Sequence, residues 1–193
     1  MYKRQVLYDG RPAEEEGRLS KELRCYDLLE QLGIPFRRAD HSAADTIAEC
    51  AAVESVIGKG IYKNLFLCNR QKTAFYLLVM PGDKPFRTKQ LSAQIHSARL
   101  SFADEALFGK YLDLTPGSVS ILGLMNDPAH HVQLLIDRDV AEAEWFRCHP
   151  CINTSSLVLK TTDLFEKFLL YTGHTPIIVD LQDETEEETN RGD

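Results

Sequence analysis

The sequence predicts an α+β fold: a single domain in which a mixed, mostly antiparallel, barrel-like β-sheet is flanked by helices. Two observations carry this prediction. The 193 residues, 44% of them apolar, suit one domain with a sufficient core. Short β-prone runs also alternate irregularly with helix-like stretches, so the order is not the strict strand–helix repeat of a parallel sheet.

The domain is expected at residues 20–181, between two polar ends. Residues 1–19 lack a clear hydrophobic pattern and are expected to form an N-terminal arm. Residues 182–193 contain six acids, one base and almost no apolar side chains, so we expect an acidic, disordered tail.

The first half of the domain is predicted to contain two helices, a short strand and a β-hairpin. Ser20 is expected to cap an amphipathic helix that Gly33 ends, and a strand follows at residues 34–40. Asp45 or Thr46 is expected to cap a second helix that runs to about residue 57. Two β-prone apolar runs then predict the hairpin, at residues 61–69 and 73–80.

The second half is predicted to mix helices and strands. Asp137 or Asp139 is expected to cap the third of four further helices. These helices are predicted at residues 88–96, 103–111, 139–146 and 163–171. Strands are predicted at residues 119–124, 132–136, 156–160 and 177–181.

Positive charge is concentrated in residues 58–99. This segment holds eight Lys or Arg against the single acid Asp83, in a chain whose net charge is −7. Its basic residues are Lys59, Lys63, Arg70, Lys72, Lys84, Arg87, Lys89 and Arg99. Such a concentration indicates a phosphate-bearing partner.

Composition also indicates the compartment. No apolar stretch approaches the length of a membrane span, and the N-terminus lacks the apolar stretch of a signal peptide. The five cysteines show no disulfide spacing, so reduced thiols are expected. We therefore expect a cytoplasmic protein with no membrane partner.

Lys63 and Asn64 interrupt an apolar strand within the basic segment. Successive strand residues point to opposite faces, so only one of them can share the face of the apolar neighbours. Lys63 is either a surface lysine on an edge strand or a phosphate-binding ammonium at the mouth of a pocket. In the second case Asn64 would contact a hydroxyl or carbonyl group of the ligand.

The segment from Cys148 to Cys151 has the form Cys-His-Pro-Cys and allows three interpretations. A redox motif would open a helix, but Pro150 and the polar residues that follow indicate a loop that enters a strand. Half of a zinc site would need a second ligand pair, which the sequence lacks. The third interpretation is a ligand-facing loop in which Pro150 orients His149 and the thiols fill the core.

The segment from Thr115 to Leu124 is a glycine-bracketed strand in the predicted fold. Gly123 either forms a β-bulge or lets the backbone approach a ligand closely. The sequence has none of the glycine-rich phosphate-binding, nucleophile-elbow or zinc-protease motifs.

Five motifs in this order resemble the prolyl-tRNA deacylase group of the YbaK/ProX superfamily, free-standing relatives of the editing domain of bacterial prolyl-tRNA synthetase. The resemblance covers about residues 20–181. The motifs are Lys63-Asn64-Leu65-Phe66-Leu67, Met80-Pro81-Gly82-Asp83-Lys84, Arg99-Leu100-Ser101-Phe102, Pro116-Gly117-Ser118-Val119-Ser120 and His149-Pro150-Cys151-Ile152-Asn153-Thr154.

The resemblance implies a YbaK/ProX-like fold and a set of site residues. Lys63 would anchor the phosphate of the 3′-terminal adenosine, with Asn64 beside it, and His149 would line a small pocket for the amino-acid side chain. The family loop G-x-x-x-P begins at Gly117 and here ends in Ile121 in place of proline. Further substrate-binding candidates are Ser118, Val119, Ser120, Ile121, Gly123, Lys84, Arg99, Pro150 and Asn153.

The resemblance also implies the reaction, which is hydrolysis of the ester of mischarged aminoacyl-tRNA, chiefly alanyl-tRNA(Pro). A synthetase pocket sized for proline cannot strongly reject a smaller residue, so a second site must remove the error. Backbone groups of the 117–121 loop and Asn64 would position the ester and a water that the substrate's 2′-hydroxyl helps to activate. No cofactor and no metal are implied.

The partner implied is the acceptor end of mischarged tRNA(Pro), with prolyl-tRNA synthetase as a second candidate; no DNA partner is expected. The chain would act as a monomer or homodimer. A cysteinyl or seryl ester remains an alternative substrate. Two other function classes also stay open: a non-catalytic tRNA-binding module and an amino-acid sensor.

Overall fold

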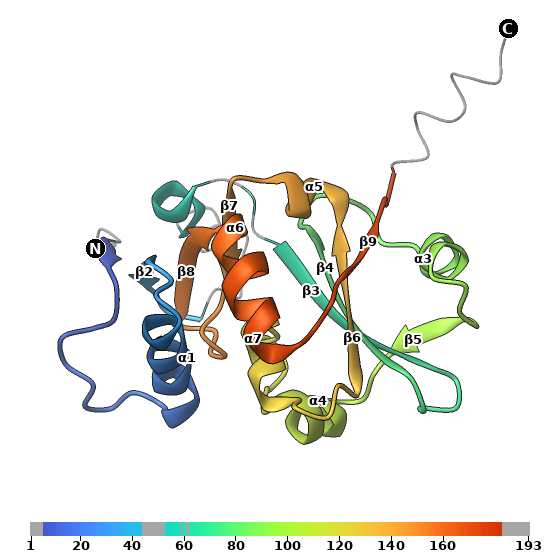
Figure 1. Ribbon diagram of the computed structural model, residues 1–193, viewed down its shortest axis with the longest axis horizontal. Helices are drawn as coiled ribbons and strands as arrows, with labels where there is room; N and C mark the ends of the chain where they lie inside the picture. Colours follow the sequence, from blue (N-terminus) through green and yellow to red (C-terminus); the bar gives the residue numbers. More distant parts are fainter. Residues whose placement is uncertain (1–5, 44–52, 59, 61, 183–193) are drawn as a thin grey trace, which may run out of the picture.

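The computed structural model describes residues 6–43, 53–58, 60 and 62–182. Within these residues the strands form two sheets with helices packed around them (Figure 1). The predicted α+β class is confirmed. The strands do not close into the expected barrel-like form, because they divide between two separate hydrogen-bonded sheets.

The first sheet is antiparallel throughout and has the strand order β1-β2-β8-β7. In that order its strands are Leu7–Asp9, Phe36–Asp40, Ser155–Lys160 and Trp145–Cys148. β1 lies in the segment expected as an arm and pairs Leu7 with Ala39 of β2. Three residues are too short a pattern to reveal this strand in the sequence.

The second sheet is mixed and has the strand order β5-β3-β4-β6-β9. In that order its strands are Leu100–Phe102, Tyr62–Asn69, Phe75–Pro81, Val132–Asp137 and Ile177–Val179. β3 and β4 form the predicted antiparallel hairpin, whereas β6 and β9 add in parallel. The central strands β4 and β6 are mostly buried, as their nearly continuous apolar sequences require.

α1 (Ser20–Gln31) packs its apolar face into the main core through Tyr26 and Leu29. Gly33 ends the helix as predicted: its φ of +62° lets the Ile34 amide donate to the Leu29 carbonyl at 2.9 Å. The start is different, because Ser20 is already helical and no side chain caps the helix.

The other helices lie mainly against the second sheet or between the sheets (Figure 1). They are α3 (Thr88–Gln94), α4 (Glu105–Leu112), the 3₁₀ helix η1 (Ile121–Asn126), α5 (Arg138–Glu142) and one continuous run of α6 (Thr161–Asp163), the π-helical η2 (Leu164–Leu169) and α7 (Leu170–Thr172). No helix in the described part of the chain is both long and apolar enough to cross a membrane.

Residues 53–57 are helical, and Val53 and Ile57 pack against Ala39 and Val158 of the first sheet. The expected caps of this helix, Asp45 or Thr46, lie outside the described residues, as does most of the acidic tail.

Two predicted elements are wrong. Residues 119–124 do not form a strand, because Ser120 accepts a hydrogen bond from the Leu122 amide and starts η1. The helix predicted at 139–146 ends at Glu142, and Trp145 begins β7 instead. The predicted cap of that helix is confirmed, since the Asp137 carboxylate accepts from the Asp139 amide at 3.0 Å.

Candidate active site

The connection from β7 to β8 carries His149, and its hydrogen bonds define the protonation of the ring. Nδ1 lies 2.9 Å from the carbonyl oxygen of Ser155. Because a carbonyl only accepts, Nδ1 carries the proton and Nε2 of the neutral ring presents a lone pair. Burial lowers the pKa of His149 below its usual 6.5, and the nearby His41 lowers it further. His149 is therefore neutral at physiological pH.

The two thiols beside His149 belong to the core, as the third interpretation of this segment expected. Cys148 and Cys151 are both buried in the main hydrophobic cluster. Cys151 Sγ lies 3.5 Å from Cys25 Sγ of α1. Burial raises the pKa of Cys148, so its thiol is protonated and unreactive. Within the described residues, no group of three or more His, Cys, Asp and Glu side chains is arranged to hold a metal ion.

The 117–121 loop lies directly against the His149 segment. Ser120 Oγ donates to the His149 carbonyl at 2.6 Å while it accepts from the Leu122 amide. At the other end of the loop, a Cβ on Gly117 would lie 3.8 Å from Asn153 Nδ2. Two segments more than 25 positions apart in sequence thus lie side by side, joined by the Ser120 hydrogen bond.

Other residues of this loop have structural tasks. Ser118 is buried, and its hydroxyl donates to the Thr115 carbonyl at 2.8 Å within the same turn. Ile121 is fully buried in the core. A Cβ on Gly123 would lie 2.8 Å from Leu114 Cδ1, so Gly123 serves the packing of η1 against the chain after α4 rather than a ligand. Val119 is partly exposed and Pro150 is buried.

Lys63 and Asn64 point to opposite faces of β3, as strand geometry requires. Asn64 shares its face with Tyr62 and Phe66, and the Tyr62 ring packs 5.2 Å from the Phe146 ring of β7. Asn64 therefore faces the interior that also holds Cys148. Lys63 Nζ donates to the Lys84 carbonyl at 2.8 Å on the other face.

The side chain of Lys84 is held inside the protein rather than offered to a ligand. Its Nζ lies 2.9 Å from Asp137 Oδ1 and 2.8 Å from Asp139 Oδ2. Asp137 is completely buried and also accepts from the Leu181 amide. Two carboxylates thus neutralise Lys84, and its carbonyl, not its ammonium, contacts Lys63.

Arg99 is not brought to this region. It is exposed and precedes β5, whose Leu100 pairs with Asn69 at the far end of β3. Asn69 lies six positions along the strand from Lys63, a distance of about 20 Å. The basic segment 58–99 is therefore not one patch: Lys72 pairs with Asp104 at the far end, and Lys84 pairs with Asp137 at the near end.

His41, which no sequence motif indicates, places a second imidazole beside His149. Its ring centroid lies 6.4 Å from that of His149, and its backbone amide donates to the Thr154 carbonyl at 3.0 Å. Its Nε2 lies 2.9 Å from Ser156 Oγ. The available signal was its position at the end of a predicted strand, which is too general to identify a site residue.

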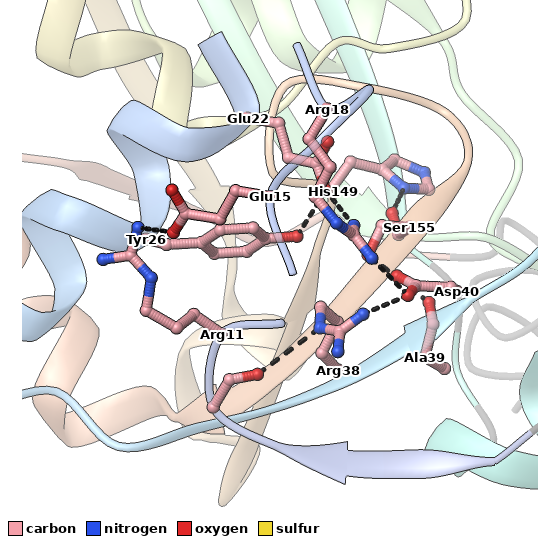
Figure 2. Close-up of polar contacts among 11 residues, drawn as sticks. Arg11, Glu15, Arg18, Glu22, Tyr26, Arg38, Ala39, Asp40, His149 and Ser155 are labelled. Atoms are coloured by element: carbon pink, nitrogen blue, oxygen red, sulfur yellow. Dashed lines mark hydrogen bonds and ion pairs between the residues drawn. The ribbon is translucent and has the colours of Figure 1, made fainter. Parts of the chain in front are cut away.

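A partly buried polar network of Arg18, α1 and β2 lies next to His149 (Figure 2). Tyr26 Oη donates to Glu22 Oε1 at 2.7 Å, and Arg18 bridges Glu22 to Asp40. Figure 2 shows Ser155, which holds His149, between this network and the imidazole. Asp40 of this network is the cross-strand partner of Ser155, so the network borders the end of β8 that binds His149.

Comparison with known proteins identifies the family. Residues 41–167 match the model of the aminoacyl-tRNA editing domain. The chain belongs to this family. The matched range contains both segments of the site, and the deacylase activity expected from the sequence is the activity of this family.

Individual relatives agree with this assignment. The chain is 34% identical over 147 residues to the prolyl-tRNA editing protein ProX of Acetoanaerobium sticklandii, covering 76% of this chain and 89% of the relative. It is 32% identical over 167 residues to the prolyl-tRNA synthetase associated domain-containing protein 1 of Xenopus laevis, covering 84% and 97%.

A solved structure of a candidate trans-editing enzyme for prolyl tRNA synthetase has the same fold. It superposes with a TM-score of 0.61 at 17% identity and covers 86% of this chain and 98% of the other. The fold expected from the family resemblance is thereby confirmed.

Proposed function

We propose that this protein hydrolyses the ester bond of mischarged aminoacyl-tRNA in trans, and that Ala-tRNA(Pro) is its main substrate. The observation that carries the proposal is the junction of the 117–121 loop with the His149 segment through the 2.6 Å bond of Ser120. Relatives named for prolyl-tRNA editing support the choice of tRNA(Pro).

The site has the features of a hydrolase that works by positioning. Neutral His149 contacts the small amino-acid side chain of the substrate without a charge. Gly117 has no side chain and is exposed, so the ester can approach the backbone there. Asn64 and backbone amides of the 117–121 loop hold the carbonyl and the attacking water. Most of the rate then comes from orientation and from stabilising the developing oxyanion.

Lys63 is assigned to the phosphate of the terminal adenosine. Its ammonium has three donors, and the Lys84 carbonyl occupies one of them. The other two remain for a phosphate, and the carbonyl contact fixes the direction of an otherwise flexible side chain. The substrate's 2′-hydroxyl helps to activate the water, so no nucleophilic side chain is required.

The test is single-turnover deacylation of Ala-tRNA(Pro) by the wild type, by Lys63→Ala and by the matched control Lys89→Ala, an exposed lysine of α3. Loss of a hydrogen bond to a charged group predicts a rate about 10- to 100-fold lower for Lys63→Ala. The control should retain the wild-type rate.

Other outcomes would favour the other classes of function. Binding of tRNA without hydrolysis by the wild type would contradict the proposal and indicate a binding module. Stabilisation by free alanine or proline without hydrolysis would contradict it and indicate an amino-acid sensor.

A further inference from the structure

The face of the first sheet that residues 53–57 partly cover carries three cations that are far apart in the sequence. Arg37 of β2 and Arg147 of β7 both pair with Val158 of the intervening strand β8, so they flank it on one face. Lys160 is the next residue of β8 on that face, and its cross-strand partner is Trp145. Strand spacing places the Arg37 and Arg147 backbones about 10 Å apart.

These cations are not neutralised as Lys72 and Lys84 are. Within the described residues, Arg37, Arg147 and Lys160 form no ion pair. Arg147 is held by carbonyls instead, with its Nε 3.0 Å from the Ile57 oxygen. A Cβ on Gly58 would lie 2.6 Å from Arg147 Nη2, so glycine at this position makes room for the guanidinium.

Trp145 supplies an aromatic surface among these charges. It is 36% exposed, and Lys160 Nζ lies 5.8 Å from the centroid of its ring. Two hollows of about 590 and 200 Å³ meet beside it, and both are lined by Trp145, Arg37 and Val158. The carboxylates at the larger hollow are Asp9 and Glu30, and Glu30 is already paired with Arg11.

We propose that this face, defined by Arg37, Trp145, Arg147 and Lys160, binds an unpaired segment of the RNA substrate by stacking one base on Trp145. An aromatic ring with cations beside it is the arrangement that holds single strands, because every base has a face that stacks and every nucleotide carries a phosphate. Paired RNA hides its base faces, so a helical segment cannot use the ring.

The inference rests on the proposed function, since that function makes tRNA the partner. It adds a contact that the basic segment 58–99 does not provide. Arg37, Arg147 and Lys160 lie outside that segment, and the sheet brings them together only through strand pairing.

The test uses Trp145 as its own probe, because it is the only tryptophan of the chain. The full-length protein is titrated with an unpaired RNA pentanucleotide, with a short RNA duplex and with uncharged tRNA while tryptophan fluorescence is recorded. We expect saturable quenching by the pentanucleotide and by tRNA, and much weaker quenching by the duplex.

Variants assign the signal to this face. Arg37→Gln should weaken pentanucleotide binding and reduce the slope of log affinity against log salt by about 0.7, as expected for one lost phosphate contact. Arg70→Gln, an exposed arginine of the hairpin turn, is the matched control and should change neither. Trp145→Phe should retain binding, measured by anisotropy of labelled RNA, whereas Trp145→Ala should weaken it about tenfold or more.

Absence of quenching by unpaired RNA, stronger quenching by the duplex, or equal effects of Arg37→Gln and Arg70→Gln would overturn the inference. Hydrolysis of Ala-tRNA(Pro) is measured with the same preparation. Hydrolysis without quenching removes the proposed face and leaves the editing function, whereas quenching without hydrolysis removes the editing function and leaves an RNA-binding face.

Discussion

His149 shows how one backbone contact sets the chemistry of a side chain. The Ser155 carbonyl accepts a hydrogen bond from Nδ1–H, and burial disfavours the imidazolium. The ring is therefore neutral, and its Nε2 carries the lone pair. A residue of the same type on an exposed loop would change charge near pH 6.5, within the physiological range.

The activity and the stability should both depend on the neutral state of His149. Its folded pKa lies below the unfolded value of 6.5, so the unfolded chain binds the proton more readily. The contribution to stability is complete above pH 6.5 and is lost as the pH falls through the folded pKa. Deacylation, corrected for the enzyme-free rate, should be flat from about pH 7 to about pH 8 and decline only in acid. A rate that rises as the pH falls through 6.5 would contradict this account.

Gly117 offers a test of backbone conformation at the site. Its φ of +79° is strained for any residue with a side chain, so Gly117→Ala should lower the free energy of unfolding by about 1 kcal/mol or more and slow deacylation. Gly109→Ala in α4 is the control, because a Cβ there meets open space and should raise stability by about 0.5 kcal/mol. Urea unfolding of both variants measures the difference, and equal effects would refute the role of the Gly117 turn.

At the scale of elements, the sequence predicted those whose ends carry a local signal. The first long helix ends at Gly33 with φ +62°, and the hairpin of β3 and β4 follows from two apolar runs. Residues 119–124 were mistaken for a strand, since a short apolar run fits a buried helical turn equally well. The helix predicted after Asp137 is too long, because Trp145 pairs with Lys160 and belongs to a strand.

The same reasoning explains which site residues could be found. Gly117 and His149 are site candidates that motifs indicate, and the structure places their segments in contact. Lys84, also taken from a motif, is instead paired with Asp137 inside the protein, a long-range contact that no local pattern reveals. His41 was missed for the same reason, because only the fold brings it to His149.

Lys84 joins the turn after β4 to the start of α5, and its removal should be costly. Lys84→Met leaves the buried Asp137 carboxylate without its cation, and loss of one partner of a buried pair costs about 3 kcal/mol or more. Asp139→Ala, which removes the exposed partner, should cost less than about 1 kcal/mol. Adding Asp137→Asn to Lys84→Met should recover part of the loss in urea unfolding. Equal costs for the two single variants would show that Asp137 is not the critical partner.

At the scale of the whole molecule, the fold redistributes the charge that the sequence concentrates. Lys63 lies near the start of β3, whereas Arg99 precedes β5, which pairs with the far end of β3. The first sheet assembles a separate group of cations around Trp145. A net charge of −7 therefore does not exclude an RNA partner. Local positive faces, rather than the sum, determine where a polyanion binds.

The acidic C-terminal segment should oppose tRNA binding. Deleting residues 183–193 removes six acids and one base, so affinity for tRNA should rise severalfold at low salt and by less at high salt. Replacing the six acids by their amides at full length controls for the loss of chain, and unchanged affinity in both variants would contradict a charge effect.

The most direct measurement of the central claim is deacylation by the wild type of tRNA(Pro) carrying alanine, cysteine, serine or proline. The account predicts rapid hydrolysis of the alanyl ester and slow hydrolysis of the prolyl ester, because we propose that the site between the Gly117 loop and His149 accepts a small side chain. Equal hydrolysis of all four esters, preference for the prolyl ester, or hydrolysis of none would contradict it.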